Sequence, residues 1–474
     1  MKSHLLIAGL MVAAACAPTK KSQAPTPAKT DSAAAATGPG GVSTPNADPF
    51  PSTYVRTASA PVVIRNVNLM TATGPMIRNG SIAIADGKII AVGANITVPT
   101  GATVIDGNGK YVTPGLIDTH SHLGVYAAPG VQALSDGNEA TNPVTANVWA
   151  EHSVWPQDPQ FPRNLAGGVT TLQVLPGSAN LIGGRSVVLK VVPARTVQAM
   201  KFPGAKYGLK MACGENPKRV YQNRGPSTRM GNVAGYRAAW INAEAYRRRW
   251  DKWNKDHKGD PPARDLGNET LAEVLRGNIL VHNHCYRADE MAQMIDIAKE
   301  FGYKVRAFHH GVEAYKIGDM LARDSIGASL WADWGAFKME AIDGIKANIA
   351  IVAKSGAIVA VHSDDPSGSQ RLNQEAAKAI AAGRDAGINI SEDEAIKWIT
   401  INAAWQLGLD DKIGSLAVGK NGDIVLWSAD PFSVYSKPEK VWVDGALMYD
   451  RTDPKEQWRT DFELGFVRTP GMMR

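Results

Sequence analysis

The chain has 474 residues, of which 44% are hydrophobic and 20% charged, and its formal net charge is +6. This balance matches a globular protein and excludes a largely disordered or membrane-embedded chain. The densest basic stretch, residues 246–253, is interrupted by Asp251 and carries large aromatic side chains. We therefore expect one solvated face of a helix there and no nucleic-acid binding.

The N-terminus has the pattern of an export signal. Lys2 precedes an apolar run from Leu5 to Ala15, which is too short to span a bilayer but fits a signal peptide. The run ends at Cys16 in a stretch that resembles a bacterial lipobox, in which the cysteine becomes the lipidated first residue. We predict a lipoprotein-type signal over residues 1–16 and a lipid-anchored protein of the periplasm. Because Ala13 stands where lipoboxes usually carry Leu, a soluble periplasmic protein is the alternative.

Residues 17–59 are dominated by Ala, Pro, Thr, Ser and Gly, which predicts a disordered tether. Beyond Cys16 the chain has only Cys213 and Cys285, so no disulfide framework is implied even in an oxidising compartment. Both cysteines stand near the ends of strands that we predict to be adjacent. One bridge would fit these positions, but we expect buried free thiols.

Short strand-like runs separated by Gly and Asn turns begin at Pro61, and similar runs return near the C-terminus. They cover residues 62–64, 81–84, 88–92, 423–427 and 440–445. We predict that residues 60–113 and 413–450 form one small β-sandwich domain from both chain ends.

Between them, residues 114–412 alternate short apolar runs with amphipathic stretches, which predicts βα repeats and an α/β fold of the (β/α)₈ TIM-barrel type. Residues 287–301 fit a helix whose Asp289, Glu290 and Lys299 face solvent. Residues 214–276 interrupt the pattern, and such an insertion would overhang the mouth of a barrel. The candidate strands end at Asp118, Leu175, Met211, His282, Phe308, Trp331 and Ser363.

Histidines gather at these strand ends. His120 and His122 are one residue apart, so their side chains project to the same side of a strand and could bind one metal. By the same alternation His284 lies with His282, where it could polarise a substrate carbonyl, whereas His309 should face away from His310, toward the helices.

Residues 112–122, VTPGLIDTHSH, resemble the first barrel strand of the amidohydrolase superfamily, in particular the branch similar to imidazolonepropionase and prolidase-like peptidases. The similarity extends over nearly everything from Val62 to Asp450. Further matches are AGGVTT at 166–171, VH at 281–282, HG at 310–311, SDDP at 363–366, ITINAA at 399–404 and GSLAVGKNGD at 414–423.

The resemblance implies that the site binds one or two divalent metal ions, of which zinc is the first expectation. His120 and His122 would bind one ion with Asp364. His282 and His310 would be the ligands from the fifth and sixth strands. Asp364 would also take a proton from the attacking water and deliver it to the leaving nitrogen.

Lys210 lies inside an otherwise apolar strand, where an unpaired ammonium is costly. In binuclear amidohydrolases a lysine at the end of the fourth strand reacts with carbon dioxide, and the carbamate bridges two metals. Lys210 matches that position. Glu215 is the competing fourth-strand ligand, because other branches use a carboxylate there, and a lysine whose head reaches solvent is a third interpretation.

These features predict a metal-dependent amidohydrolase that cleaves a C–N bond in a small substrate, such as a dipeptide or an N-acyl amino acid, through a metal-activated hydroxide. The alternatives are a cyclic amide hydrolase similar to imidazolonepropionase, or a deaminase. Deaminases of the superfamily usually carry Glu three residues after the fifth-strand His, where this chain has Cys285.

A non-enzymatic metal-binding or solute-binding lipoprotein is disfavoured because every catalytic position is filled. We expect a small-molecule amide as the substrate, no nucleic acid, and contact with a membrane only through the lipid anchor. The sequence leaves the substrate, the metal count and the oligomeric state open.

Overall fold

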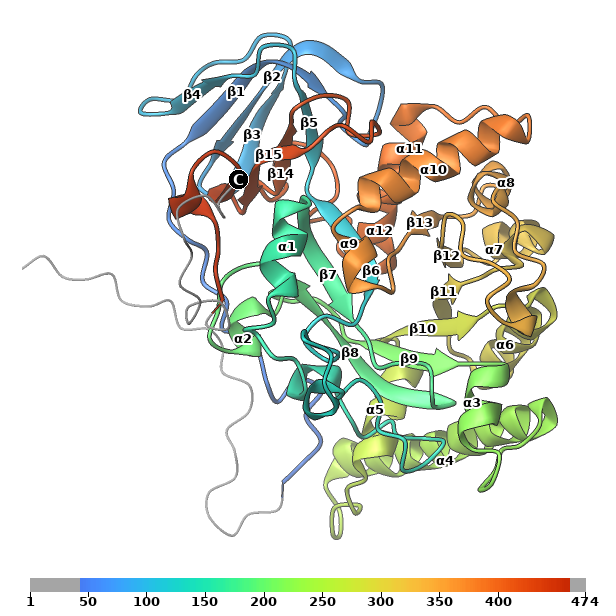
Figure 1. Ribbon diagram of the computed structural model, residues 1–474. Helices are drawn as coiled ribbons and strands as arrows, with labels where there is room; N and C mark the ends of the chain where they lie inside the picture. The colour runs from blue at the N-terminus through green and yellow to red at the C-terminus, as the bar shows by residue number, and fades with distance from the viewer. Residues whose placement is uncertain (1–42, 461–474) are drawn as a thin grey trace, which may run out of the picture. The chain divides into compact units, whose positions relative to one another are not determined.

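The computed structural model describes residues 43–460 of the chain. The central part of this region is an eight-stranded sheet surrounded by helices (Figure 1). Along the sheet the strands follow the order β13-β12-β11-β10-β9-β8-β7-β6. Their bounds are β6 Leu116–Ser121, β7 Val169–Val174, β8 Ile182–Lys190, β9 Gly208–Ala212, β10 Leu280–Cys285, β11 Val305–His310, β12 Gly327–Leu330 and β13 Val359–Val361.

The predicted TIM-type barrel is confirmed in its general form and corrected in its third strand. β8 pairs antiparallel with both β7 and β9, whereas the other neighbouring strands are parallel. Residues 175–181 are too short for the crossover of about a dozen residues that a parallel connection needs, so the chain turns back. The sheet is nearly closed, since the backbone N–H of Asp364 donates to the carbonyl of His120 across the gap between β13 and β6 (3.0 Å).

Twelve α-helices and five short 3₁₀ helices accompany the sheets within residues 43–460. The predicted helix at 287–301 is present as α6, with a left-handed Gly302 after its last turn. Their bounds are α1 Gln160–Ala166, α2 Val197–Met200, α3 Glu215–Val220, α4 Arg229–Asp256, α5 Leu266–Leu275, α6 Ala288–Phe301, α7 Gly318–Arg323, α8 Asn348–Lys354, α9 Pro366–Ser369, α10 Leu372–Asp385, α11 Glu392–Trp398 and α12 Ile401–Gln406.

Glu290 on α6 is buried, contrary to the prediction that it faces solvent, because it accepts a hydrogen bond from Arg229 at the start of α4 (3.1 Å). Arg229 also forms an ion pair with Glu340, so the start of the inserted helix α4 binds the carboxylates of Glu290 and Glu340. Among the helices of residues 43–460, none combines the length and the apolar composition that a membrane crossing requires.

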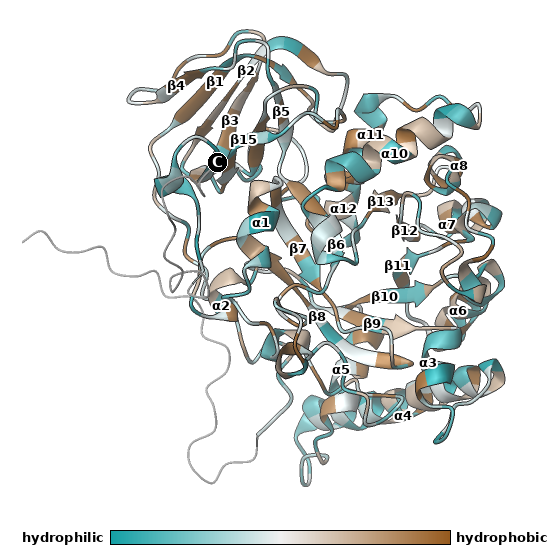
Figure 2. Ribbon diagram, in the orientation of Figure 1, coloured by the Kyte–Doolittle hydropathy of each residue, from teal (hydrophilic) through white to brown (hydrophobic). Residues whose placement is uncertain are grey.

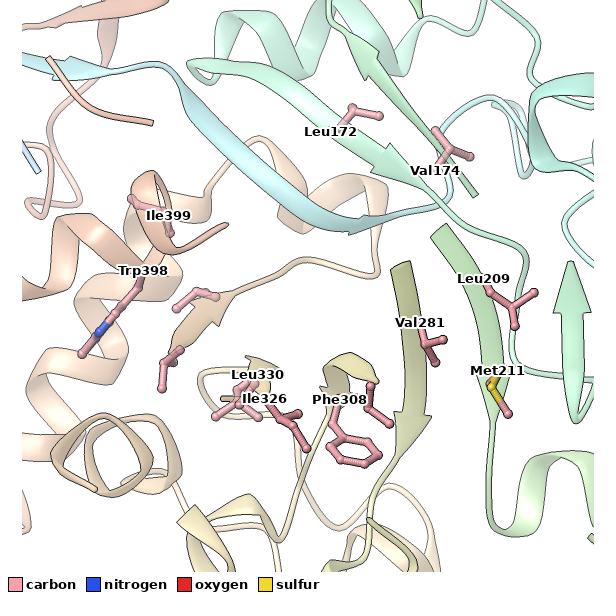
Figure 3. Packing of buried hydrophobic residues seen from close by; sticks show 14 of the residues in the cluster. Leu172, Val174, Leu209, Met211, Val281, Phe308, Ile326, Leu330, Trp398 and Ile399 are labelled. Atoms are coloured by element: carbon pink, nitrogen blue, oxygen red, sulfur yellow. The ribbon is translucent and has the colours of Figure 1, made fainter. Parts of the chain in front are cut away.

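The apolar core lies between the barrel strands and their helices. Leu209 and Met211 lie on the same side of β9, in one buried cluster with Phe308 of β11 (Figure 3). Met294 of α6 belongs to the same cluster. Hydropathy colouring shows the same distribution, with strands rich in apolar residues and the long helix α4 largely hydrophilic (Figure 2). Because strand side chains alternate, Lys210 projects to the opposite side of β9, into the barrel.

Both chain ends contribute strands to a second sheet, ordered β16-β15-β14-β5-β1-β2-β3, with β4 beside β1. β5 and β14 join the two ends as an antiparallel pair. The finer expectation of a sandwich stays a prediction. The bounds are β1 Val62–Leu69, β2 Ile77–Ala85, β3 Lys88–Gly93, β4 Thr103–Asp106, β5 Tyr111–Pro114, β14 Ile424–Trp427, β15 Pro438–Val443 and β16 Ala446–Asp450.

Residues 47–54, which fall within the predicted tether, lie against the barrel, and we call them the N-terminal strap. Arg185 donates to the carbonyl of Ala47 (2.8 Å), and Lys201 pairs with Asp48 (2.8 Å). Composition alone did not reveal these contacts. The predicted signal peptide with Cys16, and most of the predicted tether, lie outside the described residues.

Cys213 and Cys285 form a disulfide, contrary to the expectation of free thiols. Cys213 directly follows β9, and Cys285 is the last residue of the neighbouring parallel strand β10. Their Cα atoms are 5.3 Å apart, within the range that a disulfide spans. The bond therefore joins the ends of β9 and β10, close to Lys210 and His284.

Candidate active site

His120 of β6 and His122, which directly follows β6, project into the barrel at its carboxyl-terminal end. His120 is fully buried and His122 largely so, and their rings are 5.1 Å apart. This agrees with the alternation expected for residues two apart in a strand. The carboxyl ends of barrel strands are where active sites form in TIM-type folds.

Asp364 completes a first group with these two histidines. Its Oδ1 atom lies 3.3 Å from Nε2 of His120 and 3.2 Å from Nε2 of His122. Asp364 has a φ of 60°, a strained value for an aspartate that turns the side chain into the barrel after β13. Burial alone would raise the pKa of Asp364, but the hydrogen bond and charge of His122, with His362 and Lys210, lower it to about 2.

A second group consists of His120, His310 and His362, whose ligand nitrogens lie within 4.8 Å of one another. His310 ends β11 with a φ of 72°. His362 was not singled out from the sequence, although it directly precedes Ser363 and Asp364 in the matched segment, and its place at the end of a buried strand could have drawn attention to it.

Lys210 lies at the centre of the histidines. Its Nζ atom is 3.2 Å from Nε2 of His120, and the side chain is fully buried. Burial lowers the pKa of Lys210 to about 7, although the charge of Asp364 partly offsets this effect. Because Lys210 is 0% exposed, the interpretation that its head reaches solvent is wrong.

His309 faces the barrel interior, contrary to the prediction that it faces the helices. Its Nε2 atom is 2.8 Å from Nδ1 of His282, and its Nδ1 atom is 2.9 Å from Nδ1 of His120. Phe308 occupies the helix-facing position instead. The left-handed φ of His310 then breaks the alternation, so that two consecutive histidines both enter the site.

His282 and His284 lie at different depths of β10. His282 is the direct neighbour of Lys210 in the sheet, and burial lowers its pKa to about 3. His284 has its ring 4.5 Å from that of His310, and its nitrogens contact Ser178 (2.8 Å) and Asn216 (3.4 Å). Neither histidine belongs to the two close ligand groups.

Glu215 lies outside both groups. It is the first residue of α3, and its carboxylate is 3.4 Å from the Lys338 ammonium. Its backbone N–H donates to Glu340 (2.9 Å). Lys210 therefore lies among the histidines of the site, whereas Glu215 pairs with Lys338 outside it. This geometry favours Lys210 over Glu215 as the fourth-strand residue of the site.

Asp118 lies next to the site and holds two of its segments through hydrogen bonds. It is fully buried, accepts the backbone N–H of His120 (3.1 Å), and also accepts the hydroxyl of Ser363. Burial raises the pKa of Asp118 to about 7, against the lowering effect of these hydrogen bonds. Asp118 thus joins β6 to the segment that carries Asp364.

The donor set fits a divalent metal. Within residues 43–460, Nε2 of His282, Nδ1 of His310 and both ring nitrogens of His362 are buried without a hydrogen-bond partner. Burial lowers the pKa of His120, His310 and His362, so these imidazoles are neutral at neutral pH, the form that binds metals. Buried polar atoms without partners are rare in proteins unless they have a ligand.

Known proteins are similar to this chain in sequence and in fold. The profile of the amidohydrolase family matches residues 111–448. The chain is 33% identical over 400 residues to the amidohydrolase tasK of Hapsidospora irregularis, which covers 79% of this chain and 40% of that protein. It is 26% identical over 423 residues to the imidazolonepropionase of Stenotrophomonas maltophilia, covering 77% and 90% of the two chains.

A solved amidohydrolase from Thermotoga maritima is similar in structure, with a TM-score of 0.76 and 36% sequence identity. The alignment covers 82% of this chain and all of that one. The matched family segment runs from β5 to β16 and therefore contains every residue of the candidate site. The chain is a hydrolase that acts on carbon–nitrogen bonds of small molecules, and it belongs to the amidohydrolase family.

Proposed function

We propose that the chain hydrolyses the amide bond of a small substrate such as a dipeptide or an N-acyl amino acid, with zinc as its metal. The observation that carries this proposal is a fully buried lysine without a carboxylate partner, placed among unpartnered histidine nitrogens and beside Asp364. Such an arrangement is costly for a folded protein unless a ligand completes it.

His120, His122 and Asp364 would hold one ion. Lys210 as a carbamate, with His310 and His282, would hold a second, and His362 offers a further nitrogen to this side of the site. A bound divalent metal would lower the pKa of a water molecule and polarise the substrate carbonyl.

Asp364 would perform the proton transfers. Its low pKa keeps it ionised at neutral pH, so it can accept a proton from the attacking water and pass it to the leaving nitrogen. Asp118 and Ser363 position this segment through their hydrogen bonds. His284, whose Nδ1 atom contacts the hydroxyl of Ser178, would polarise the substrate carbonyl.

Formation of a carbamate requires the free amine of Lys210 to attack carbon dioxide, forming an N–C bond and releasing a proton. The pKa of about 7 leaves a large fraction of the amine unprotonated at neutral pH. A lysine with an ordinary pKa of about 10.4 would be almost entirely protonated there.

The test is to screen the metal-loaded protein against dipeptides and N-acyl amino acids while its zinc content is measured, with Asp364→Asn as the inactive control. Turnover of such amides that depends on Asp364 would support the proposal. A protein that binds metal but cleaves only cyclic amides or releases ammonia would contradict it.

The second candidate is hydrolysis of a cyclic amide of the imidazolonepropionase type. Similarity to the imidazolonepropionase of Stenotrophomonas maltophilia over 90% of that protein favours it. A parallel assay for ring opening of an imidazolone or a hydantoin distinguishes the two candidates. Deamination is less favoured because Cys285, three residues after His282, is occupied by the disulfide.

We also propose that the protein is exported and held at the membrane by a lipid on Cys16, on the strength of the N-terminal sequence. Cys16→Ser should release the protein from the membrane fraction while its turnover stays unchanged. Continued fractionation with membranes would show that another element anchors it.

A further inference from the structure

Aromatic side chains cover one side of the candidate site. The ring of Trp331 lies 4.1 Å from that of His310 at a tilt of 31°, and the ring of Trp334 stacks on Trp331 at 5.1 Å. Tyr286 and Phe337 add ring contacts to Trp331 at 6.1 and 5.7 Å. These residues follow β10 and β12, and we call them the aromatic wall.

A cavity of about 210 Å³ lies along this wall. Its lining combines the apolar residues Val312, Trp331, Trp334 and Ile345 with polar ones, namely His310, Asp333, Lys346 and Asn348. His310 lines the cavity and also belongs to the second ligand group, so the cavity borders the candidate site. An engineered apolar cavity of about 150 Å³ accepts a benzene ring in another protein, so this one is large enough for an aromatic or branched aliphatic side chain.

One polar atom of the wall lacks a partner. The indole Nε1 of Trp331 is buried and has no hydrogen-bond acceptor among residues 43–460. The indole Nε1 atoms of Trp240, Trp250 and Trp398 also lack a partner within that range, but of these four tryptophans only Trp331 lines the cavity, where its donor is available to an acceptor. A carbonyl oxygen next to an apolar side chain, as in a peptide or an N-acyl amino acid, would supply it.

We propose that the aromatic wall selects amides that carry a large apolar side chain next to the scissile C–N bond, with that side chain in the cavity and a substrate carbonyl bound by Trp331. This proposal deepens the function proposed above and rests on it. Trp334 lines the cavity and is 39% exposed, so the aromatic wall extends from the cavity to the surface.

The experiment compares kcat/KM for matched pairs that differ only in side-chain size, such as N-acetyl-phenylalanine with N-acetyl-alanine and Phe-Ala with Ala-Ala. Wild-type protein should prefer the large member of each pair. Val312→Phe, which fills the cavity, and Trp334→Ala, which removes part of the wall, should each reduce that preference about 10-fold, mainly through KM.

Met339→Ala is the matched control, because Met339 belongs to the same loop, is 77% exposed and does not line the cavity. Its preference should equal that of the wild type. Metal content and Tm of each variant show whether it has folded, and Trp334→Ala changes a partly exposed residue in case Val312→Phe does not fold.

Three outcomes separate the two proposals. A wild-type preference for large side chains that both cavity variants reduce supports the aromatic wall. Amide turnover without that preference, or with a preference that both variants retain, overturns the wall but leaves the proposed function intact. Absence of amide turnover in fully metal-loaded wild-type protein overturns the proposed function and this specificity with it.

Discussion

Lys190 and Lys210 are equally buried, at 1% and 0% exposure, yet their surroundings differ. The ammonium of Lys190 lies 3.0 Å from a carboxylate oxygen of Asp444 and 3.5 Å from one of Asp423, above the ring of Phe202. The nearest polar contact of Lys210 is a histidine nitrogen. A buried lysine with two carboxylates is a structural cation, whereas one without any is available for reaction.

The reversed strand β8 separates the two lysines. Lys190 ends β8 opposite Thr171, which lies near the start of β7, whereas Lys210 pairs with Gly184 near the start of β8. Because β8 runs antiparallel to its neighbours, its end lies beside the amino ends of the parallel strands. Lys190 therefore contacts Asp423 and Asp444 around the second sheet, and Lys210 lies at the catalytic end of the barrel.

The largest effect is expected from Lys210→Ala, which should abolish turnover and lower the metal content. Wild-type protein prepared with bicarbonate should hold close to two metal equivalents, because only the carbamate is an anionic ligand. Acetate or propionate should restore part of the variant's activity by filling the vacated space.

Glu215→Ala is the matched control for this prediction and should retain its metal. Metal analysis of both variants decides between the two residues. If Lys210→Ala keeps its metal while Glu215→Ala loses it, the fourth-strand ligand is Glu215.

Asp364→Asn should lower kcat by about 10²-fold or more while the metal stays largely bound. The amide can still offer an oxygen, but it cannot carry a proton between water and the leaving nitrogen. Steady-state kinetics together with metal quantification measure the two effects separately. Turnover near the wild-type value would reject the proton-transfer role.

Lys190→Ala should decrease the free energy of unfolding by about 3–5 kcal/mol, because it leaves Asp423 and Asp444 buried without their cation. Metal content should be unchanged, in contrast to Lys210→Ala. Urea denaturation and metal analysis of the two variants make this comparison directly. Loss of metal from Lys190→Ala would show that the two lysines do not have separate roles.

The smallest effect concerns pH. Burial raises the pKa of Asp423 to about 6, although the charge of Lys190 acts in the opposite direction. Because the folded state binds this proton more tightly than the unfolded state, its contribution to stability is full below about pH 4 and is lost as the pH rises to about 6.

The free energy of unfolding of wild-type protein should therefore fall relative to that of Asp423→Asn between pH 4 and 6, on the order of 2 kcal/mol. Urea titrations of both proteins at several pH values give this difference. An unchanged difference over that range would mean that Asp423 keeps an ordinary pKa.

Local sequence patterns predicted the positions of single strands and the direction of their side chains. The position of most barrel strands and the common side of His120 and His122 follow from apolar runs and strand alternation. The direction of β8 depends on the length of one connection, and no candidate strand end was assigned to it. The bridge between Cys213 and Cys285 depends on the distance between two strand ends.

The site was only partly predictable for a similar reason. His309 was placed on the helix side because regular alternation was assumed, and the left-handed φ of His310 cannot be read from residue type. Glu290 was assigned to solvent because its partner Arg229 is 61 residues away in the sequence. His362 directly precedes the matched segment 363–366, so the motif that marks Asp364 does not include it.

The N-terminal strap also determines where the gene can be trimmed for expression. The family match begins at residue 111, inside the second sheet, so a fragment cut there would lose β1 to β4. A fragment starting at residue 60 would keep that sheet but leave the buried Lys201 without Asp48 and the ring of Trp149 without its contact to Phe50. A recombinant protein that starts at residue 45 would retain the whole strap and both contacts.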